Sequence, residues 1–218
     1  TIGICMKHII AATAFAILSA LALALPVKAD ERAEMERAIT RVESYLSTLK
    51  TMQASFIQED WQGGIRSGDF YLHRPGRLRF DYDPLEGSSQ GDFIVADGTF
   101  IFYYDAALKQ QSNTLIGQTL ADFILREDVS FEEKLLVTNI ENNDQSLALT
   151  LVQREDPAAG SLTLNFNRSP FQIVGWTVKD AQGLRTDIRL NDIETGMKLD
   201  RTLFFYHDPD YGRVEYNQ

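Results

Sequence analysis

Residues 68–82 read GDFYLHRPGRLRFDY, and this stretch decides the fold. Apolar residues alternate with polar ones before the Pro75-Gly76 pair, and the alternation resumes after it with arginine and aspartate side chains facing the other way. A period of two is typical of β-strands with one apolar face, and Pro-Gly favours a turn between them. The stretch therefore predicts a β-hairpin with these residues on its apolar face: Gly68, Phe70, Leu72, Leu78, Phe80 and Tyr82.

The same period continues on both sides of this hairpin. A strand is predicted upstream at 54–60, before a Gly63-Gly64 turn, and two more follow downstream at 93–95 and 100–104. Strand signals resume after residue 126, so the chain is expected to hold about eleven antiparallel strands joined largely by hairpins. The later strands are predicted at 135–140, 147–152, 162–166, 173–178, 184–190 and 203–206.

Two stretches have helical rather than strand spacing. From Glu31 to Lys50 the apolar residues recur every three or four positions with charged residues between them, which predicts an amphipathic helix. The segment 115–126 has the same spacing and predicts a second, short helix that interrupts the sheet. Its apolar face is expected to consist of Leu115, Ile116, Thr119, Leu120, Phe123 and Ile124.

A sheet of this length tends to curl, and two helices cannot cover both of its faces. The concave face must therefore be filled by the helices, by side chains or by a ligand. Aromatic residues are frequent on it, and they either form an ordinary core or line a ligand cavity. The pattern alone favours the ordinary core. The aromatic residues in question are Phe70, Phe80, Phe93, Phe102 and Phe123.

The first 29 residues differ from the rest. Lys7 and His8 precede an apolar run over 9–25, and a small-residue exit ends at Ala29, a pattern typical of a secretory signal peptide. A transmembrane anchor is the alternative, but the alanine, threonine and serine content of the run disfavours it. The sequence therefore divides into a signal peptide at 1–29, with a start-site extension before Met6, and a single domain at 30–218.

The composition argues against several classes of function. A formal net charge of −10 disfavours binding to nucleic acid or to anionic membrane surfaces, since phosphate contacts need clustered cations. The single cysteine, Cys5, precedes the apolar run, so the exported domain would have neither disulfides nor thiolate chemistry. Zinc-binding spacings, a nucleophile elbow and phosphate-binding loops are absent from the sequence. We expect no catalytic residue, metal or cofactor, and thus not an enzyme.

The stretch at 68–82, followed by FIVADGTFIFYYD at 93–105, closely resembles the family of periplasmic outer-membrane lipoprotein carriers (LolA). Members combine a glycine and an aromatic residue ahead of Arg-Pro, an aromatic strand, an Asp-Gly turn and an aromatic-Tyr-Asp ending. Residues 56–58 are also similar to the first strand of the family, and the likeness runs from about Arg32 to Pro209. Phe80 stands where members often have tryptophan.

The resemblance implies a mainly β fold with some α structure: an incomplete, strongly curved antiparallel β-barrel with an N-terminal helix and a short lid helix over its hydrophobic mouth. It implies that the interior holds the acyl chains of a lipoprotein. A monomeric periplasmic carrier would accept this cargo from an ATP-driven inner-membrane release complex and pass it to an outer-membrane receptor. The alternative is a receptor-like or sensor module of the same fold that binds lipid or phospholipid acyl chains.

Particular residues are expected to carry this function. Arg74 is expected to point into the barrel and donate hydrogen bonds to backbone carbonyls of the lid, because its guanidinium offers five donors. The alternative is a solvated arginine in a turn. Arg77 and Arg79 are expected on the outer face.

The lid is expected to contain Leu115, Ile116, Leu120, Phe123 and Ile124, with a fixed packing helix as the alternative. The acyl-binding residues are expected to be Phe70, Leu72, Leu78, Phe80, Tyr82, Phe93, Phe102 and Tyr104.

Overall fold

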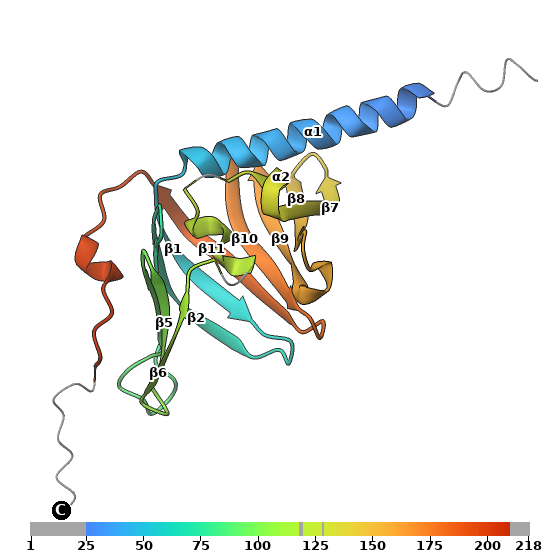
Figure 1. Cartoon of the computed structure of the whole chain (residues 1–218). Coiled ribbons are helices and arrows are strands. Elements are labelled where there is room, and N and C mark those ends of the chain that lie inside the picture. The colour runs from blue at the N-terminus through green and yellow to red at the C-terminus, as the bar shows by residue number, and fades with distance from the viewer. Residues whose placement is uncertain (1–24, 118–119, 128, 210–218) are drawn as a thin grey trace, which may run out of the picture. The chain divides into compact units, whose positions relative to one another are not determined.

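The structure, a computed structural model, describes residues 25–117, 120–127 and 129–209 (Figure 1). The chain divides into two compact units, one ending at Thr40 and the other beginning at Arg41. Helix α1 spans Leu25–Thr48, so its last two turns belong to the second unit together with all of the strands. The helix begins before the predicted Glu31. Most of the predicted signal peptide lies outside the described residues.

The second unit is built on one antiparallel sheet of 11 strands. Their order is β6-β5-β4-β3-β2-β1-β11-β10-β9-β8-β7, so β11 returns to pair with β1 and the sheet is not closed. Figure 1 shows the sheet bending around the short helix η1. The open, curved antiparallel architecture is as predicted. The strands are β1 (Thr51–Glu59), β2 (Ile65–His73), β3 (Arg77–Tyr82), β4 (Phe93–Asp97), β5 (Phe100–Asp105), β6 (Gln110–Leu115), β7 (Leu135–Asn142), β8 (Ser146–Gln153), β9 (Gly160–Arg168), β10 (Phe171–Asp180) and β11 (Arg185–Thr195).

The structure differs from the prediction at two strands. Strand β6 was not predicted, because its sequence QQSNTL is largely polar and every one of its side chains is exposed. Conversely, the predicted strand at 203–206 is replaced by the 3-10 helix η3 (Arg201–Phe204) and an extended continuation. The side chain of Asp200 caps η3 by accepting a hydrogen bond from the Thr202 amide at 2.9 Å.

The predicted helix at 115–126 is only partly right. Leu115 is the last residue of β6, and the helical turn that follows is the 3-10 helix η1 (Leu120–Leu125). Thr119 and the side chain of Leu120 lie outside the described residues. The helical spacing therefore runs across a strand end and a separate helical turn. Two further short helices, α2 (Phe131–Lys134) and η2 (Pro157–Ala159), were not predicted.

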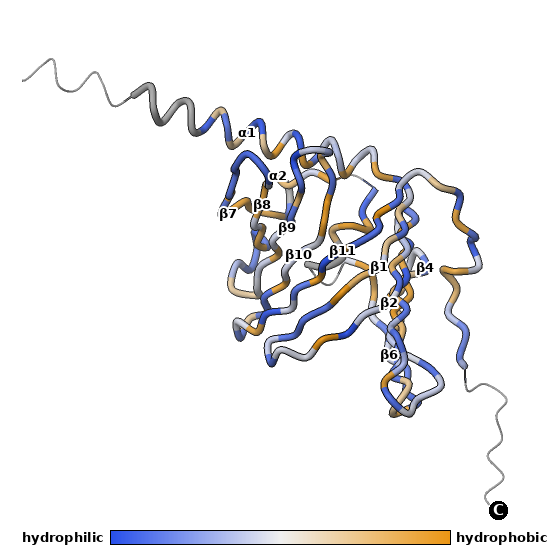
Figure 2. Tube along the Cα trace, turned by 180° about the vertical axis from the view of Figure 1, so that it is seen from behind, coloured by the Kyte–Doolittle hydropathy of each residue, from blue (hydrophilic) through white to orange (hydrophobic). Residues whose placement is uncertain are grey.

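The strand registers sort the side chains onto two faces. In the β2–β3 hairpin, Phe70 lies opposite Phe80 and Leu72 opposite Leu78, and directly opposed residues share a face. This is the inner face, around which the sheet bends and on which η1 lies, whereas η3 lies on the outer side (Figure 1). Figure 2 shows the corresponding alternation of hydrophilic and hydrophobic residues along the strands.

The C-terminal end of α1 packs against strands β9 and β10. The Tyr45 ring meets the rings of Phe166 and Phe171 edge-on, at centroid distances of 5.6 and 5.7 Å. The Arg41 guanidinium lies over the Phe171 ring, 4.0 Å from its centroid. Leu46, on the same turn of the helix, is fully buried. This contact anchors the second unit's part of α1 beside β9 and β10.

Candidate functional site

Five of the eight predicted acyl-binding residues lie together on the inner face, all on the β2–β3 hairpin. Phe70 packs against Phe80 with ring centroids 4.7 Å apart, and Phe56 from β1 meets Phe80 edge-on at 5.0 Å. Trp176 from β10 completes the cluster, 5.8 Å from Phe70. We call Phe56, Phe70, Leu72, Leu78, Phe80, Tyr82 and Trp176 the inner cluster.

Tyr82 forms the polar end of the inner cluster. Its hydroxyl donates to the Gln58 Oε1 atom at 2.8 Å, and the Arg66 guanidinium lies 5.0 Å from the centroid of its ring. Burial raises the pKa of Tyr82 to about 12, because the phenolate would lose hydration that the neighbouring Arg66 charge replaces only in part. The inner cluster is therefore uncharged throughout, and it ends at the neutral hydroxyl of Tyr82.

The other three predicted acyl-binding residues lie on the opposite face. Phe93 lies across from Tyr104 and stacks on it at 5.0 Å, and Phe102 stacks on Tyr206 at 4.9 Å. Placing Phe93, Phe102 and Tyr104 on the inner face was wrong. The alternation within β4 and β5 is right, but its phase relative to β3 depends on register, and a shift of one residue exchanges the faces.

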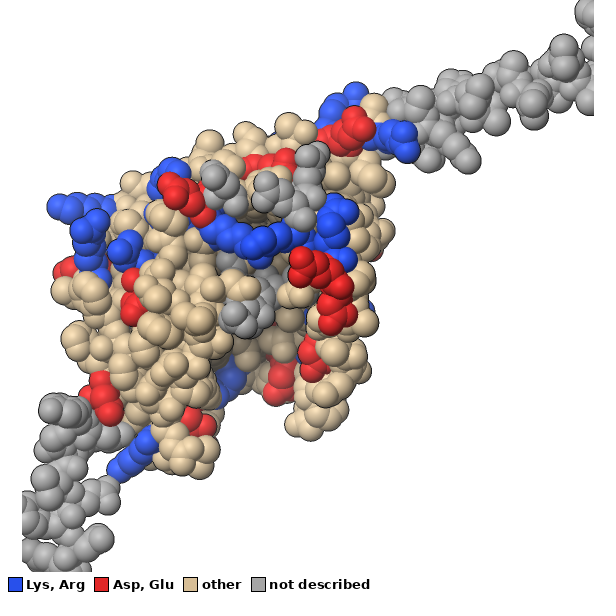
Figure 3. Space-filling model, in the orientation of Figure 1, with Lys and Arg blue, Asp and Glu red and all other residues tan. Residues whose placement is uncertain are grey.

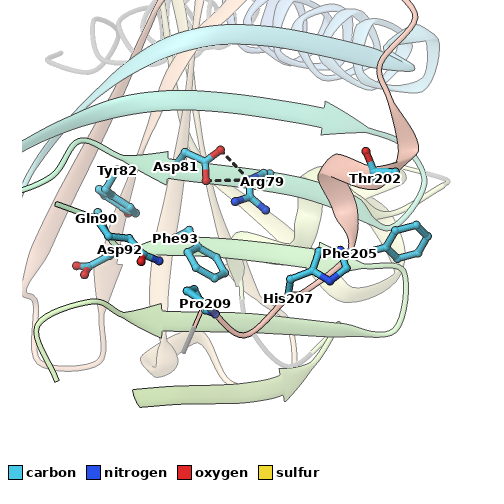
Figure 4. A pocket seen from close by; sticks show the side chains of 11 residues that line it. Arg79, Asp81, Tyr82, Gln90, Asp92, Phe93, Thr202, Phe205, His207 and Pro209 are labelled. Atoms are coloured by element: carbon cyan, nitrogen blue, oxygen red, sulfur yellow. Dashed lines mark hydrogen bonds and ion pairs between the residues drawn. The ribbon is translucent and has the colours of Figure 1, made fainter. Parts of the chain in front are cut away.

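A pocket of about 460 Å³ lies on this outer face, between β3, β4 and the C-terminal segment (Figure 4). Arg79 lines it, with its Nε atom donating to the Asp81 carboxylate at 2.7 Å and its Nη1 atom donating to the Leu203 carbonyl at 3.3 Å. Arg79 thus faces outward as predicted. It is also packed beneath the C-terminal segment, and its guanidinium lies 5.1 Å from the Phe93 ring centroid.

Arg74 follows the end of β2 and is only 5% exposed. Its Nε and Nη2 atoms donate to the Arg126 carbonyl, Nη2 donates to the Glu127 carbonyl at 3.2 Å, and Nη1 donates to the Leu49 carbonyl at 3.3 Å. A solvated turn arginine does not fit this burial. The hydrogen bonds are those that the family resemblance implied.

The carbonyl groups at the end of η1 have no partner in the next helical turn, and the β2–β3 turn supplies the donors. Besides Arg74, the Gly76 amide donates to the Leu125 carbonyl at 2.8 Å. Gly76 has a φ of +79°, and a Cβ atom there would come within 2.9 Å of the Gly98 Cα atom. Glycine is therefore required at this position for the turn to reach η1.

The last three side chains of η1 fill the interior of the bent sheet. Phe123, Ile124 and Leu125 are 1%, 2% and 2% exposed. Leu115, in contrast, lies opposite Phe100 at the edge of the sheet and is 48% exposed, and the Ile116 amide donates to the Thr99 carbonyl at 3.0 Å. Of the predicted lid residues, Phe123 and Ile124 are buried on η1, whereas Leu115 and Ile116 belong to the β5–β6 end.

No helix among the described residues combines the length and the apolar composition needed to span a bilayer. Within the same residues there is no group of three or more His, Cys, Asp or Glu side chains placed to hold a metal ion. On the face in Figure 3, Lys and Arg side chains are interspersed with Asp and Glu. The net negative charge is therefore not gathered into one acidic patch on that face.

The described residues therefore define a class of structure. It is an open antiparallel half-barrel with an aromatic inner face and a short helix tethered inside it. The sequence profile of the family described as outer membrane lipoprotein carrier protein LolA matches residues 47–207. The match covers more than half of the chain. This protein therefore belongs to the LolA family.

Individual relatives are similar over most of the chain. An outer-membrane lipoprotein carrier protein of Legionella pneumophila (strain Lens) is 30% identical over 182 residues, covering 77% of this chain and 84% of its own. The carrier protein of Methylococcus capsulatus is 26% identical over 178 residues, covering 78% and 83%. A solved structure of a LolA superfamily protein from Nitrosomonas europaea matches with a TM-score of 0.42 at 12% identity, covering 79% of this chain and 98% of that one.

Proposed function

We propose that this protein is a periplasmic carrier that shelters the acyl chains of lipoproteins on the inner face of its sheet. It would accept them from an ATP-driven inner-membrane release complex and pass them to an outer-membrane receptor, without catalysing a reaction. Membership of the LolA family and relatives named lipoprotein carriers support this proposal. The observation that carries it is an aromatic inner face covered by η1, which Arg74 holds through backbone carbonyls.

A carrier must bind its cargo and also release it. Each buried methylene contributes about 0.8 kcal/mol, so a fully sheltered sixteen-carbon chain would gain roughly 10 kcal/mol. A protein that captured all of this free energy would retain its cargo permanently. A competing occupant of the interior lowers the net affinity, and Phe123, Ile124 and Leu125, which are buried on η1, would be that occupant in the empty state.

Arg74 would set the balance between the closed and the loaded states. Cargo that enters the inner face must displace η1, and displacement breaks the hydrogen bonds from Arg74 to Arg126 and Glu127. Each charge-assisted bond contributes roughly 1.5–3 kcal/mol. When the cargo leaves, these bonds form again, so closure of the lid favours release.

The direct test is binding of an environment-sensitive fluorescent acyl probe to the purified protein. We expect fluorescence to rise on binding and to fall when a triacylated lipoprotein displaces the probe. The same lipoprotein without its acyl chains is the matched control and should not displace it. A native protein that leaves the probe dark would contradict the proposal.

The cargo class can be tested independently by mass spectrometry of what copurifies from the periplasm. Acylated lipoprotein is the expected result. Copurification of free phospholipid alone would contradict the carrier proposal and favour the receptor-like or sensor alternative, which uses the same apolar interior.

A further inference from the structure

The segment Leu49–Thr51, here called the connection, links α1 to β1 and includes the first residue of β1. It is hydrogen-bonded to segments on both faces of the sheet. We define the C-terminal strap as residues 199–207, which cover the outer face, and the lid as η1 on the inner face. We propose that the strap and the lid are energetically coupled through the connection Leu49–Thr51, so that loosening the strap opens the lid. The effect of this coupling on cargo binding rests on the proposed function, whereas the coupling itself does not.

On the lid side, Arg74 holds the connection. Its backbone amide donates to the Lys50 carbonyl at 2.8 Å, and its Nη1 atom donates to the Leu49 carbonyl at 3.3 Å. The remaining guanidinium nitrogens donate to Arg126 and Glu127 at the end of η1. One side chain therefore bonds the connection and the lid simultaneously.

On the strap side, Thr51 holds the connection. Its Oγ1 atom donates to the Met197 carbonyl at 2.8 Å, and its carbonyl accepts from the Gly196 amide at 3.2 Å. Thr51 is only 9% exposed, so water does not readily replace these bonds. Gly196 and Met197 lead directly into the strap.

The strap is seated on the outer face by buried aromatic contacts. Phe204 is fully buried, with its ring 5.9 Å from that of His73, and Tyr206 stacks on Phe102. His73 lies opposite Thr51 in the β1–β2 pair and directly precedes Arg74. Successive side chains at the end of a strand point to opposite faces. His73 therefore contacts the strap, and Arg74, the next residue, contacts the lid.

The connection is three residues long and is held from both sides, which is why a change on one side should reach the other. Hydrogen bonds weaken steeply when their distance or angle departs from the ideal. If Thr51 loses its bond to Met197, just before the strap, the carbonyls of Leu49 and Lys50 are less firmly placed for Arg74, and the closed lid becomes less stable. Thermodynamic linkage requires the reverse effect as well, from the lid to the strap.

The test is amide hydrogen exchange of the ligand-free protein, resolved by residue. The Gly76 amide, bonded to Leu125, reports on the lid, and the Phe205 amide, bonded to Thr202 at 3.3 Å, reports on the strap. Thr51→Val removes the hydroxyl donor at nearly constant shape. We expect it to speed exchange at Gly76 about fivefold or more, and Arg74→Leu to speed exchange at Phe205 similarly.

Two controls separate coupling from general destabilisation. Thr51→Ser keeps the hydroxyl and should exchange like the native protein at Gly76. Phe205→Ala alters a strap side chain that is 50% exposed, and should leave Gly76 unchanged. Unchanged exchange at Gly76 in Thr51→Val, or equal acceleration in all three variants, would overturn the coupling.

The exchange readout needs no acyl ligand, so the coupling and the proposed function can fail separately. If the native protein does not bind the acyl probe but Thr51→Val still speeds exchange at Gly76, the carrier proposal fails and the coupling stands. If the probe binds, Thr51→Val should bind it more tightly than the native protein, because the closed lid competes less well.

Discussion

Arg74 and Arg126 lie 52 positions apart in the sequence, and the carbonyl oxygen of Arg126 accepts hydrogen bonds from both the Nε and the Nη2 atoms of Arg74. The acceptor is a backbone atom, so the contact depends on where η1 lies and not on the side chain at position 126. A guanidinium suits this task because it presents several donors in a fixed plane and stays charged.

Replacing Arg74 with leucine tests the lock. The variant loses hydrogen bonds worth roughly 1.5–3 kcal/mol each, and it places an apolar side chain beside the inner face. Both effects favour the open, loaded state. We expect Arg74→Leu to bind the acyl probe about tenfold more tightly or better, to accept lipoprotein from donor membranes, and to deliver it slowly to acceptor membranes.

Arg77→Leu is the control for this experiment, because Arg77 begins β3 on the outer face, opposite His73 and Asp97. It should load and deliver normally. Arg79 also lies on the outer face, but it is unsuitable as a control because its Nη1 atom donates to the Leu203 carbonyl in the strap. Normal delivery by Arg74→Leu would refute the lock while leaving the carrier assignment intact.

The pH dependence of stability tests the burial of Tyr82. Its pKa is about 12 in the folded protein and 10.0 for an ordinary tyrosine, so the neutral hydroxyl is favoured by folding. This contribution is complete below pH 10 and is lost as the pH rises from 10 to 12, because the unfolded chain ionises first. The loss should approach roughly 2–3 kcal/mol.

Urea unfolding of the native protein and of Tyr82→Phe, at pH 8 and at steps from 10 to 12, measures this effect. The variant should lose less stability over the alkaline range, whereas the difference at pH 8 reflects the loss of the buried hydroxyl and its hydrogen bond to Gln58. Parallel alkaline curves for the two proteins would show that Tyr82 is not buried as described.

The position of the mature N-terminus tests the export prediction. Cleavage after Ala29 would leave Asp30 first, within the span of α1, and acidic residues are favourable at the start of a helix. We expect intact-mass measurement of the periplasmic protein to show a chain beginning at Asp30. An uncleaved chain in the membrane fraction is the contrary result.

The sequence was sufficient for the inner face wherever a short turn fixes the register. Phe70 and Phe80 are joined through the tight turn at Pro75-Gly76, so their alternation could be read as one face. The loop at 83–92 breaks this continuity, and periodicity alone could not show on which face Phe93 would lie. Trp176 reaches the inner cluster only because β11 pairs with β1, a long-range contact with no local signal.

The lid and the strap were harder to predict for different reasons. Helical spacing at 115–124 combined the end of β6 with η1, since three or four apolar residues fit either element. The strap resembled a strand because it contains consecutive aromatic residues, which are common in strands, and because their burial alternates. Phe204 is fully buried and Phe205 is 50% exposed. The strap nevertheless packs on the sheet through side chains, such as Phe204 on His73, and not through the backbone hydrogen bonds of a strand.

The division of the aromatic residues between two faces gives the last prediction. Phe80, 6% exposed on the inner face, should contact acyl chains, so Phe80→Ala should weaken probe binding about tenfold, from roughly 1.5 kcal/mol of lost apolar contact. Phe102 packs on Tyr206 on the outer face, so Phe102→Ala should not weaken binding, and it should increase affinity if a looser strap opens the lid. Fluorescence titration of both variants with the acyl probe, after matching their folded fractions by circular dichroism, gives the comparison. Weaker binding by Phe102→Ala than by Phe80→Ala would contradict the prediction, because it would place the acyl site on the outer face.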